Sequence, residues 1–245
     1  MTFRRFDTVL LVGALIVVWE LVFLMVGPDI ISSPLATIAR AIELLQSRNF
    51  WDNAAATGIA FVYASIISIV GGLALGLWLG LRRFAGDVAD PILGTLYSIP
   101  KITLYPLILL IFGLGLPAKV AFGAIHGLLP IAIFTMNAVR NVSPIYYKTA
   151  QVMRVSPWST AMTIFAPAAL PEVLAGIRLG VALTLLGTLI GELFAATSGI
   201  GFALIQATDL NDVVDILALT LLLFTFAAVI NGVLHYAERR VRHDG

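Results

Sequence analysis

Six stretches of mostly apolar residues alternate with shorter polar segments along the chain. A helix needs about 20 such residues to cross the hydrocarbon core of a bilayer. No run of ten-residue segments with alternating hydrophobicity suggests a membrane barrel. The pattern predicts an all-α, polytopic membrane protein with six transmembrane helices. We place them at residues 8–26, 55–81, 91–112, 117–139, 172–195 and 213–236.

Two segments between the spans are long enough to hold further structure. On the outer side, Ser33-Pro34 begins a helix by an N-cap and a first-turn proline, and Leu35, Ile38 and Ile42 give it an apolar face. Residues 1–53 then form an N-terminal transmembrane helix and an outer amphipathic helix. Residues 54–245 form a core of five transmembrane helices with a long inner loop at 140–166.

Composition supports a membrane location. Apolar residues make up 60% of the 245 residues and charged residues 12%, whereas soluble domains carry roughly 25% charged residues. The chain has no cysteine and three histidines, which excludes disulfides and thiolate metal sites and argues against a metal cluster.

The distribution of charge predicts the orientation. Six spans put both termini on one side, and most of the cations fall on that side. Because Lys and Arg mark the cytoplasmic side, both termini are expected in the cytoplasm. The outer side receives Arg40 and Arg48, with Lys119 as a further candidate. The inner cations are Arg4, Arg5, Arg82, Arg83, Arg140, Lys148, Arg154, Arg239, Arg240 and Arg242.

The inner loop repeats the Ser-Pro start signal. Ser143-Pro144 predicts a short helix to about residue 155, and Ser156-Pro157 predicts a second helix that Pro167 should stop. Such a pair would project from the membrane. The pattern alone leaves open whether the pair packs against its own bundle or docks a soluble partner.

A few polar and small residues lie inside the predicted spans. The glycines at 71, 72, 76 and 80 suit close helix packing. Arg178 is expected to pair or to reach the interface. For His126, a hydrogen bond to a neighbouring helix is favoured over a proton relay.

The inner loop resembles a known motif. Its sequence is Lys148-Thr149-Ala150-x3-Arg154-x9-Ile164-x-Ala166-Pro167, which is similar to the E-A-A-x3-G-x9-I-x-L-P loop of permease subunits of ATP-binding-cassette (ABC) importers. Ala150, Ile164 and Pro167 match, and the spacing is intact. Lys148, Thr149, Arg154 and Ala166 depart from it.

Other segments resemble the nitrate/sulfonate/taurine branch of these permeases. They are SIPKITLYPL at 98–107, FGLG at 112–115, PAALP at 167–171, GIR at 176–178 and GELFAATSGIG at 191–201. The resemblance extends from about residue 30 to residue 240.

The resemblance implies a type I ABC importer permease fold in a bacterial cytoplasmic (inner) membrane. The implied partners are two cytoplasmic ATPase subunits, a second permease copy that makes a homodimer, an extracytoplasmic substrate-binding protein and the bilayer, with no nucleic acid. The implied function is a path for a small solute, expected to be an anion such as a sulfonate, nitrate or carboxylate, opened by alternating access. The chain contains no G-x-x-x-x-G-K-[ST] loop, so no cofactor is expected here and ATP and Mg belong to the partner ATPase. The chain itself is not expected to be an enzyme.

The motif also implies a coupling site. In the family, the first helix of this loop sits in a groove of the ATPase, so Ala150 and Met153 are expected there as buried contacts. Lys148 reverses the charge of the family's Glu. Arg154 replaces a Gly in a turn where a positive φ would disfavour a side chain. The coupling residues are Tyr146, Lys148, Thr149, Ala150, Met153, Arg154, Ile164 and Pro167.

Four residues within or beside the spans are candidates for the translocation path: Lys101, Tyr105, Glu192 and Ser198. Ionisable groups at this depth usually mark a path or a pair. Lys101, between two prolines, could face a cavity or pair with an acid or a carbonyl. For Glu192, a hydrogen bond that fixes the turn at 197–201 is favoured over solute contact.

Two other classes of function remain as alternatives. A channel or secondary carrier would work without an ATPase, but no repeat between the halves is apparent. An intramembrane serine protease would need a serine motif that could use His126, and the sequence offers none.

Overall fold

The computed structural model describes the backbone of residues 2–243 and the side chains of residues 10–236, except those at positions 144, 147, 151, 157 and 195. Within these residues the chain forms helices and turns only, which confirms the all-α prediction. The cationic side chains at 4, 5, 239, 240 and 242 lie outside the described part. The helices are α1 (Thr2–Val26), α2 (Pro34–Gln46), α3 (Arg48–Leu81), α4 (Arg83–Ser98), η1 (Lys101–Leu104), α5 (Tyr105–Phe112), α6 (Leu116–Arg140), α7 (Pro144–Val152), α8 (Pro157–Thr160), η2 (Ala161–Phe165), α9 (Ala166–Ala195), α10 (Ile200–Asp209) and α11 (Val213–His243).

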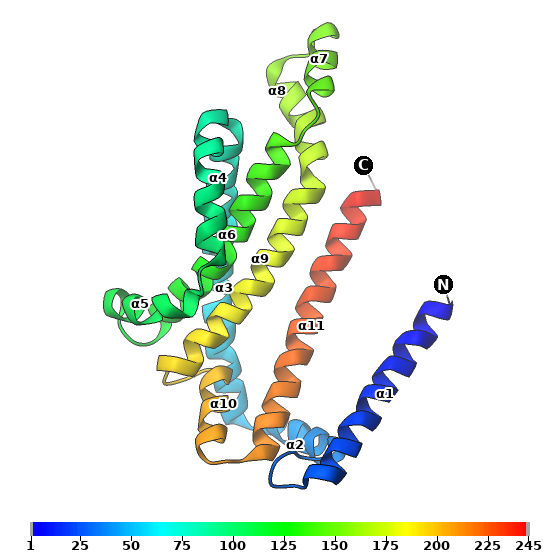
Figure 1. Cartoon of the computed structure of the whole chain (residues 1–245), viewed down its shortest axis with the longest axis vertical. Coiled ribbons are helices and arrows are strands. Elements are labelled where there is room, and N and C mark those ends of the chain that lie inside the picture. Colours follow the sequence, from blue (N-terminus) through cyan, green and yellow to red (C-terminus); the bar gives the residue numbers. More distant parts are fainter. Residues whose placement is uncertain (1, 244–245) are drawn as a thin grey trace.

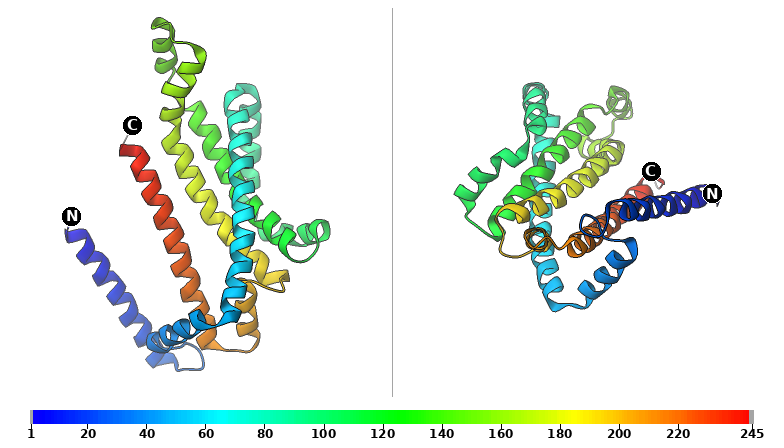
Figure 2. Two further views of the ribbon diagram at one scale, coloured as in Figure 1. Left: turned by 180° about the vertical axis from the view of Figure 1, so that it is seen from behind. Right: turned by 60° about the horizontal axis from the view of Figure 1, so that its bottom comes forward.

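The helices form an elongated bundle. The helices α3, α6 and α9 pack together at its centre, with α11 beside α9 (Figure 1). The N-terminal helix α1 stands away from the bundle and joins it through α2 (Figure 2). The helix α7 lies at one end of the molecule and α2 and α10 at the other, while α1 begins about halfway along and descends to α2 (Figure 1).

Four helices in the described part are long and apolar enough to span a membrane: Arg48–Leu81, Leu116–Arg140, Trp158–Phe194 and Val213–Tyr236. A bent pair, Arg83–Ser98 with Lys101–Phe112, counts as a fifth span if it is taken as one. The segment Leu10–Val26 is a shorter apolar helix.

Glycines allow the central helices to approach closely. A Cβ added at Gly127 of α6 would lie 1.9 Å from Thr184 Oγ1 and 2.7 Å from the Gly180 carbonyl oxygen, both on α9. On α3, a Cβ at Gly76 would lie 2.6 Å from the carbonyl oxygen of Ala132. Small residues at such crossings are typical of membrane helices, because they let backbones pack against one another. The predicted packing role of the glycines is confirmed.

The span predicted at residues 91–112 is not one continuous helix. The helix begins earlier, at Arg83, and stops at Ser98, and the two halves meet at 88°. Pro100 lacks an N–H and forces the residue before it out of the helical region, and Ile99 is extended with φ −65° and ψ 134°. Pro106 then lies in the first turn of α5, a position that proline tolerates.

The prediction that Pro167 ends a loop helix is wrong. Helix continues from Trp158 to Phe194, so the loop helix and the fifth span are one element. The wide turn η2 precedes Pro167, and the Ala166 N–H bonds the carbonyl of Ala161, five residues back. This π turn re-routes the backbone hydrogen bonds just before Pro167, which lies in the first turn of α9.

The helix predicted to begin at Ser33-Pro34 is confirmed as α2, and its outer location stays a prediction. The Ser33 side chain accepts a hydrogen bond from the Ala36 N–H at 3.2 Å. The helix is tied to the start of α11 by Arg40, which forms an ion pair with Asp215 through two nitrogens, one of them 3.1 Å from Oδ2. This hydrogen bond and a second one to Glu43 raise the pKa of Arg40. The apolar Leu35 and Ile38 point away from the fold and are exposed.

Candidate functional site

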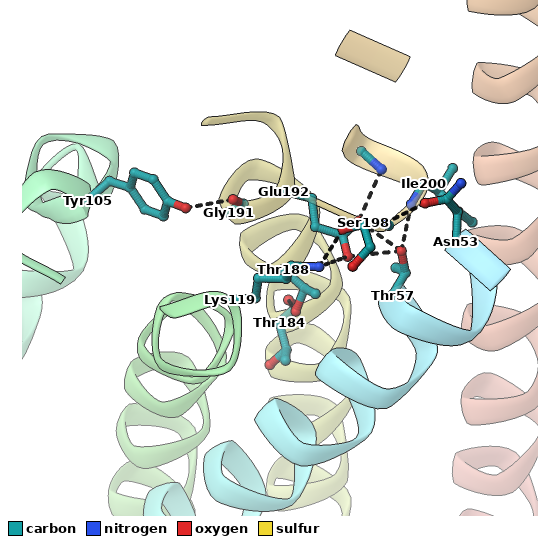
Figure 3. A network of polar contacts seen from close by, with 12 residues as sticks. Asn53, Thr57, Tyr105, Lys119, Thr184, Thr188, Gly191, Glu192, Ser198 and Ile200 are labelled. Carbon is teal, nitrogen blue, oxygen red and sulfur yellow. Dashed lines mark hydrogen bonds and ion pairs between the residues drawn. The ribbon is translucent and has the colours of Figure 1, made fainter. Parts of the chain in front are cut away.

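A buried polar network lies where α9 ends and turns into α10 (Figure 3). Glu192 is 1% exposed and accepts hydrogen bonds on both oxygens from Thr57 Oγ1 of α3, at 2.8 and 3.0 Å. The Gly201 N–H donates to Glu192 Oε2 at 3.0 Å. The carboxylate therefore joins α3, α9 and α10 and has its acceptor sites occupied, as a buried charge requires.

Lys119 of α6 provides the opposite charge. Its side chain is 3% exposed, and its Nζ lies 3.3 Å from Glu192 Oε1 and also donates to the carbonyl of Ser198. The ion pair is fully removed from solvent, so losing either partner would leave an unpaired buried charge. Lys119, a further candidate for an outer-side cation, is buried in the fold and not exposed at a membrane surface.

The backbone of the 196–199 turn is held by the same network. The Ile200 N–H donates to Thr57 Oγ1 at 2.8 Å, and the Gly199 N–H donates to Asn53 Oδ1 at 2.8 Å. Gly199 has φ +120°, and a Cβ there would lie 2.2 Å from Glu192 Cδ. The turn thus depends on a glycine for both its backbone angle and its space.

The prediction that a hydrogen bond made by Glu192 fixes this turn is confirmed, since its carboxylate accepts from the Gly201 N–H. The Ser198 carbonyl takes part in the network, and the Ser198 side chain is half-buried. Glu192 is buried in this conformation, so contact between it and a solute requires the turn to open. A role in the path therefore stays a prediction for both residues.

Tyr105 and Lys101 lie at the bent pair. Tyr105 is buried, its hydroxyl donates to the Gly191 carbonyl at 2.6 Å, and its ring packs edge-on against Phe122. Lys101 is half-buried at the corner between α4 and α5. Its Nζ donates to the Tyr97 carbonyl at 2.9 Å and lies 4.8 Å from the centre of the Tyr97 ring. The structure brings Tyr105, but not Lys101, beside the Glu192 network.

The predicted coupling residues lie at the opposite end, on α7 and the segment after it. Tyr146, Lys148 and Thr149 are exposed, and the exposed fractions of Val152 and Met153 are 84% and 70%. Apolar side chains at the tip of a projecting helix favour the docking of a partner over packing on the bundle. Ala150 is buried within the chain itself, so it is not available to a partner in the expected way.

Arg154 ends this helix in the left-handed conformation, with φ 53°. The Val155 N–H bonds the Ala150 carbonyl at 3.0 Å, the six-to-one bond of a Schellman C-cap. A glycine is the usual residue at this position. The prediction that Arg154 occupies a turn with positive φ is confirmed.

The remaining coupling residues belong to the continuous helix. Ile164 lies in the π turn η2 and is half-buried, and Pro167 is exposed in the first turn of α9. The motif therefore spans the junction between the projecting helix and a membrane-spanning one.

Residues 68–243 match the family described as "Binding-protein-dependent transport system inner membrane component". The chain belongs to this family. It is therefore a multi-pass transport permease of the inner membrane, as the resemblance of its inner loop implied.

Several curated permeases are similar to this permease. The taurine transport system permease protein TauC of Escherichia coli is 24% identical over 80% of this chain and 74% of its own length. The nitrate import permease protein NrtB of Synechocystis is 25% identical over 94% of this chain and 89% of its own. The formylaminopyrimidine transport permease protein ThiX of Halalkalibacterium halodurans is 28% identical over 82% of this chain and 80% of its own.

The fold is also similar to a solved structure. A chain of the MetNI methionine ABC transporter, titled as inward facing, aligns with a TM-score of 0.60 at 20% identity, over 82% of this permease and 98% of that chain. The all-α fold of this permease is thus that of a type I ABC importer permease.

Sequence reasoning missed two members of the outer network. Lys119 comes two residues after the start of a predicted span, and its position inside an apolar run beside Phe122 was a signal of burial. Thr57 has no sequence signal, because a threonine in a membrane helix usually bonds its own backbone.

Two further polar residues within the spans, Arg178 and His126, lie outside this network. Arg178 Nη1 lies 2.9 Å from His235 Nδ1. His126 bonds the Phe122 carbonyl of its own helix, so the expected bond to a neighbouring helix is wrong.

Proposed function

We propose that this permease carries a small anionic solute across the inner membrane by alternating access driven by two ATPase subunits. The observation that carries the proposal is the single helix from Trp158 to Phe194. At 1.5 Å per residue it is roughly 55 Å long. It begins a few residues after α7 and ends at the buried network around Glu192. A displacement of α7 by an ATPase would therefore reach the turn at Glu192 through the short segment 153–157 and one continuous helix.

The proposed ATPase contact is the tip of α7. Its exposed surface combines the apolar Val152 and Met153 with the cations Lys148 and Arg154. An apolar groove with acidic residues at its rim would complement this surface. The family motif has a Glu at the position of Lys148. Because Lys148 reverses that charge, we expect the ATPase of this system to have an acidic residue where it contacts Lys148.

A second copy of the permease is proposed as the partner within the membrane. The helix α1 contacts its own fold through α2, where Trp19 Nε1 donates to the Ser32 carbonyl at 2.9 Å. Residues 10–18 of α1 are exposed, and Trp19 and Glu20, which follow them, are half-buried. Such a helix leaves apolar surface for a second copy. With α7 in the cytoplasm, we expect both termini on that side as well.

The anionic solute class rests on the relatives named for taurine and nitrate, and on the half-buried cation Lys101 at the bend of α4 and α5. The relative named for formylaminopyrimidine transport makes a neutral heterocycle the second candidate. Each class would be delivered by an extracytoplasmic binding protein.

The test is reconstitution of the permease with the ATPase and binding protein encoded beside it. We expect ATP-dependent uptake of a sulfonate or nitrate that stops when residues 143–155 are deleted, while the permease still inserts in the membrane. Uptake that persists without ATPase subunits would instead support a secondary carrier. Binding of a pyrimidine, but of no anion, by the binding protein would overturn the solute class.

A further inference from the structure

A large apolar groove lies where the coupling loop meets the membrane-spanning helices. Its volume is about 750 Å³, and its walls come from α3, α6, the segment after α7, the π turn η2 and the first turns of α9. It contains Leu77 and Leu81 on one side and Met162, Phe165 and Leu170 on the other. The groove is separate from the polar network at Glu192.

The lining of the groove is almost wholly apolar. Of the described residues that line it, only Thr135 and Thr160 have polar side chains. Thr160 Oγ1 donates to the Ser156 carbonyl at 3.0 Å. Thr135 is 0% exposed, and its hydroxyl has no hydrogen-bond partner among the described residues. Because the Thr135 hydroxyl is buried, a ligand in the groove would meet an apolar surface.

Two cations are neighbours in sequence of residues that line the groove. Arg82 directly follows the lining residue Leu81, and Arg154 directly precedes the lining residue Val155. Both arginines are exposed. The groove thus combines an apolar interior with two cations close to its lining residues along the chain, at the end of the membrane span.

We propose that this groove binds a phospholipid of the cytoplasmic leaflet, with one acyl chain along α3 and α9 and its phosphate at Arg82 and Arg154. Water would not fill an apolar cavity of this kind, and the bilayer beside the spans supplies acyl chains. The apolar lining suits an acyl chain, and anionic headgroups favour basic sites at this membrane face.

A bound lipid would contact both the coupling segment and the spans. The groove is lined at once by Ala150 and Val155 of the coupling segment, by the π turn and by α3. A bound acyl chain would fill the space between α7 and the spans, where α7 would move relative to them. The site itself does not depend on the proposed transport function, and its test uses binding alone.

The test uses the full chain in phosphatidylcholine vesicles that contain phosphatidylglycerol with a diazirine in one acyl chain. After illumination, we expect labelled peptides that contain Met162, Phe165 or Leu170. Ala169→Phe fills the groove from α9, where Ala169 is a lining residue. Labelling of those peptides should fall about tenfold, which corresponds to a loss of about 1.4 kcal/mol in binding free energy.

The matched control is Ala168→Phe, which adds the same side chain one residue earlier, at an exposed position outside the groove. Its groove labelling should equal that of the original chain. Labelling of the exposed α11 residues Val229 and Val233 reports correct insertion in every variant. Equal groove labelling in both variants overturns the proposal. So does a crosslink from these residues to a second permease copy, because the partner would then occupy the groove.

Discussion

At the scale of single residues, Arg154 is the clearest departure from what local chemistry favours. A left-handed backbone costs a residue with a Cβ roughly 1–2 kcal/mol, and Arg154 holds φ 53° to close the C-cap of α7. The same cap geometry recurs at Asn211, also with φ 53°, but asparagine tolerates this region. The strain at Arg154 is therefore specific to the coupling segment.

We predict that Arg154→Gly raises the stability of the permease by about 1 kcal/mol, because it relieves this backbone strain. The measurement is the thermal unfolding midpoint of the purified permease. Arg154→Ala is the matched control, since it removes the same charge and side chain but keeps the Cβ. An equal gain from both substitutions would show that the side chain, and not the backbone angle, is responsible.

The pair of Lys119 and Glu192 gives the second prediction. Removing one partner of a buried pair costs about 3–5 kcal/mol, so Lys119→Met and Glu192→Gln should each lower the unfolding midpoint strongly. The double substitution should cost less than the sum, because it leaves no unpaired charge. A chain with Lys148→Met, which removes an exposed cation, should unfold like the original. Simple additivity of the two single effects would contradict the pairing.

Sequence reasoning could predict one half of this pair. Glu192 in an apolar run beside a glycine-rich turn indicated a hydrogen bond that fixes the turn. Its partners could not be predicted, because Thr57 and Lys119 lie 135 and 73 residues away along the chain. Only the packing of three helices brings them together.

At the scale of helices, the seam between α6 and α9 depends on glycine. We predict that Gly127→Ala destabilises the permease by at least about 1–3 kcal/mol, because a Cβ there would overlap Thr184 Oγ1 and the Gly180 carbonyl. Gly58→Ala on α3 is the control, since a Cβ there meets nothing within 4 Å. That change should alter stability by no more than about 1 kcal/mol. Unfolding in detergent compares the two, and equal losses would refute a tight seam.

The prolines show which helix boundaries can be predicted from local sequence signals. Pro34 and Pro144, each after a serine, begin helices as the sequence predicts. Pro100 breaks the third span instead of merely loosening it. Pro167 does not end a helix, because the π turn before it rearranges the backbone bonds. A π turn leaves no pattern that periodicity can detect, so the length of the fifth span could not be read from the sequence.

At the scale of the whole molecule, the helix from Trp158 to Phe194 runs between the two candidate sites. One end holds the exposed coupling segment, and the other holds the turn pinned by Glu192. The sequence predicted both ends as separate features. Their connection became visible only when the fold showed that no break separates the loop helix from the fifth span.

The final prediction concerns the charge at the coupling tip. Lys148→Glu restores the acidic residue of the family motif. It would also place a negative charge against the acidic ATPase surface that we propose for the contact with Lys148. Exposed contacts of one charge pair are worth about 0.2–1 kcal/mol, and reversal adds repulsion to the lost attraction. We therefore expect less ATPase to co-purify with the permease and slower ATP-dependent uptake, with both effects weaker at high salt. Arg48→Glu at the opposite end of the molecule, also an exposed cation, is the control and should leave co-purification unchanged. If Lys148→Glu leaves assembly and uptake intact, this charge takes no part in coupling. In that case the apolar tip at Val152 and Met153 must carry the contact.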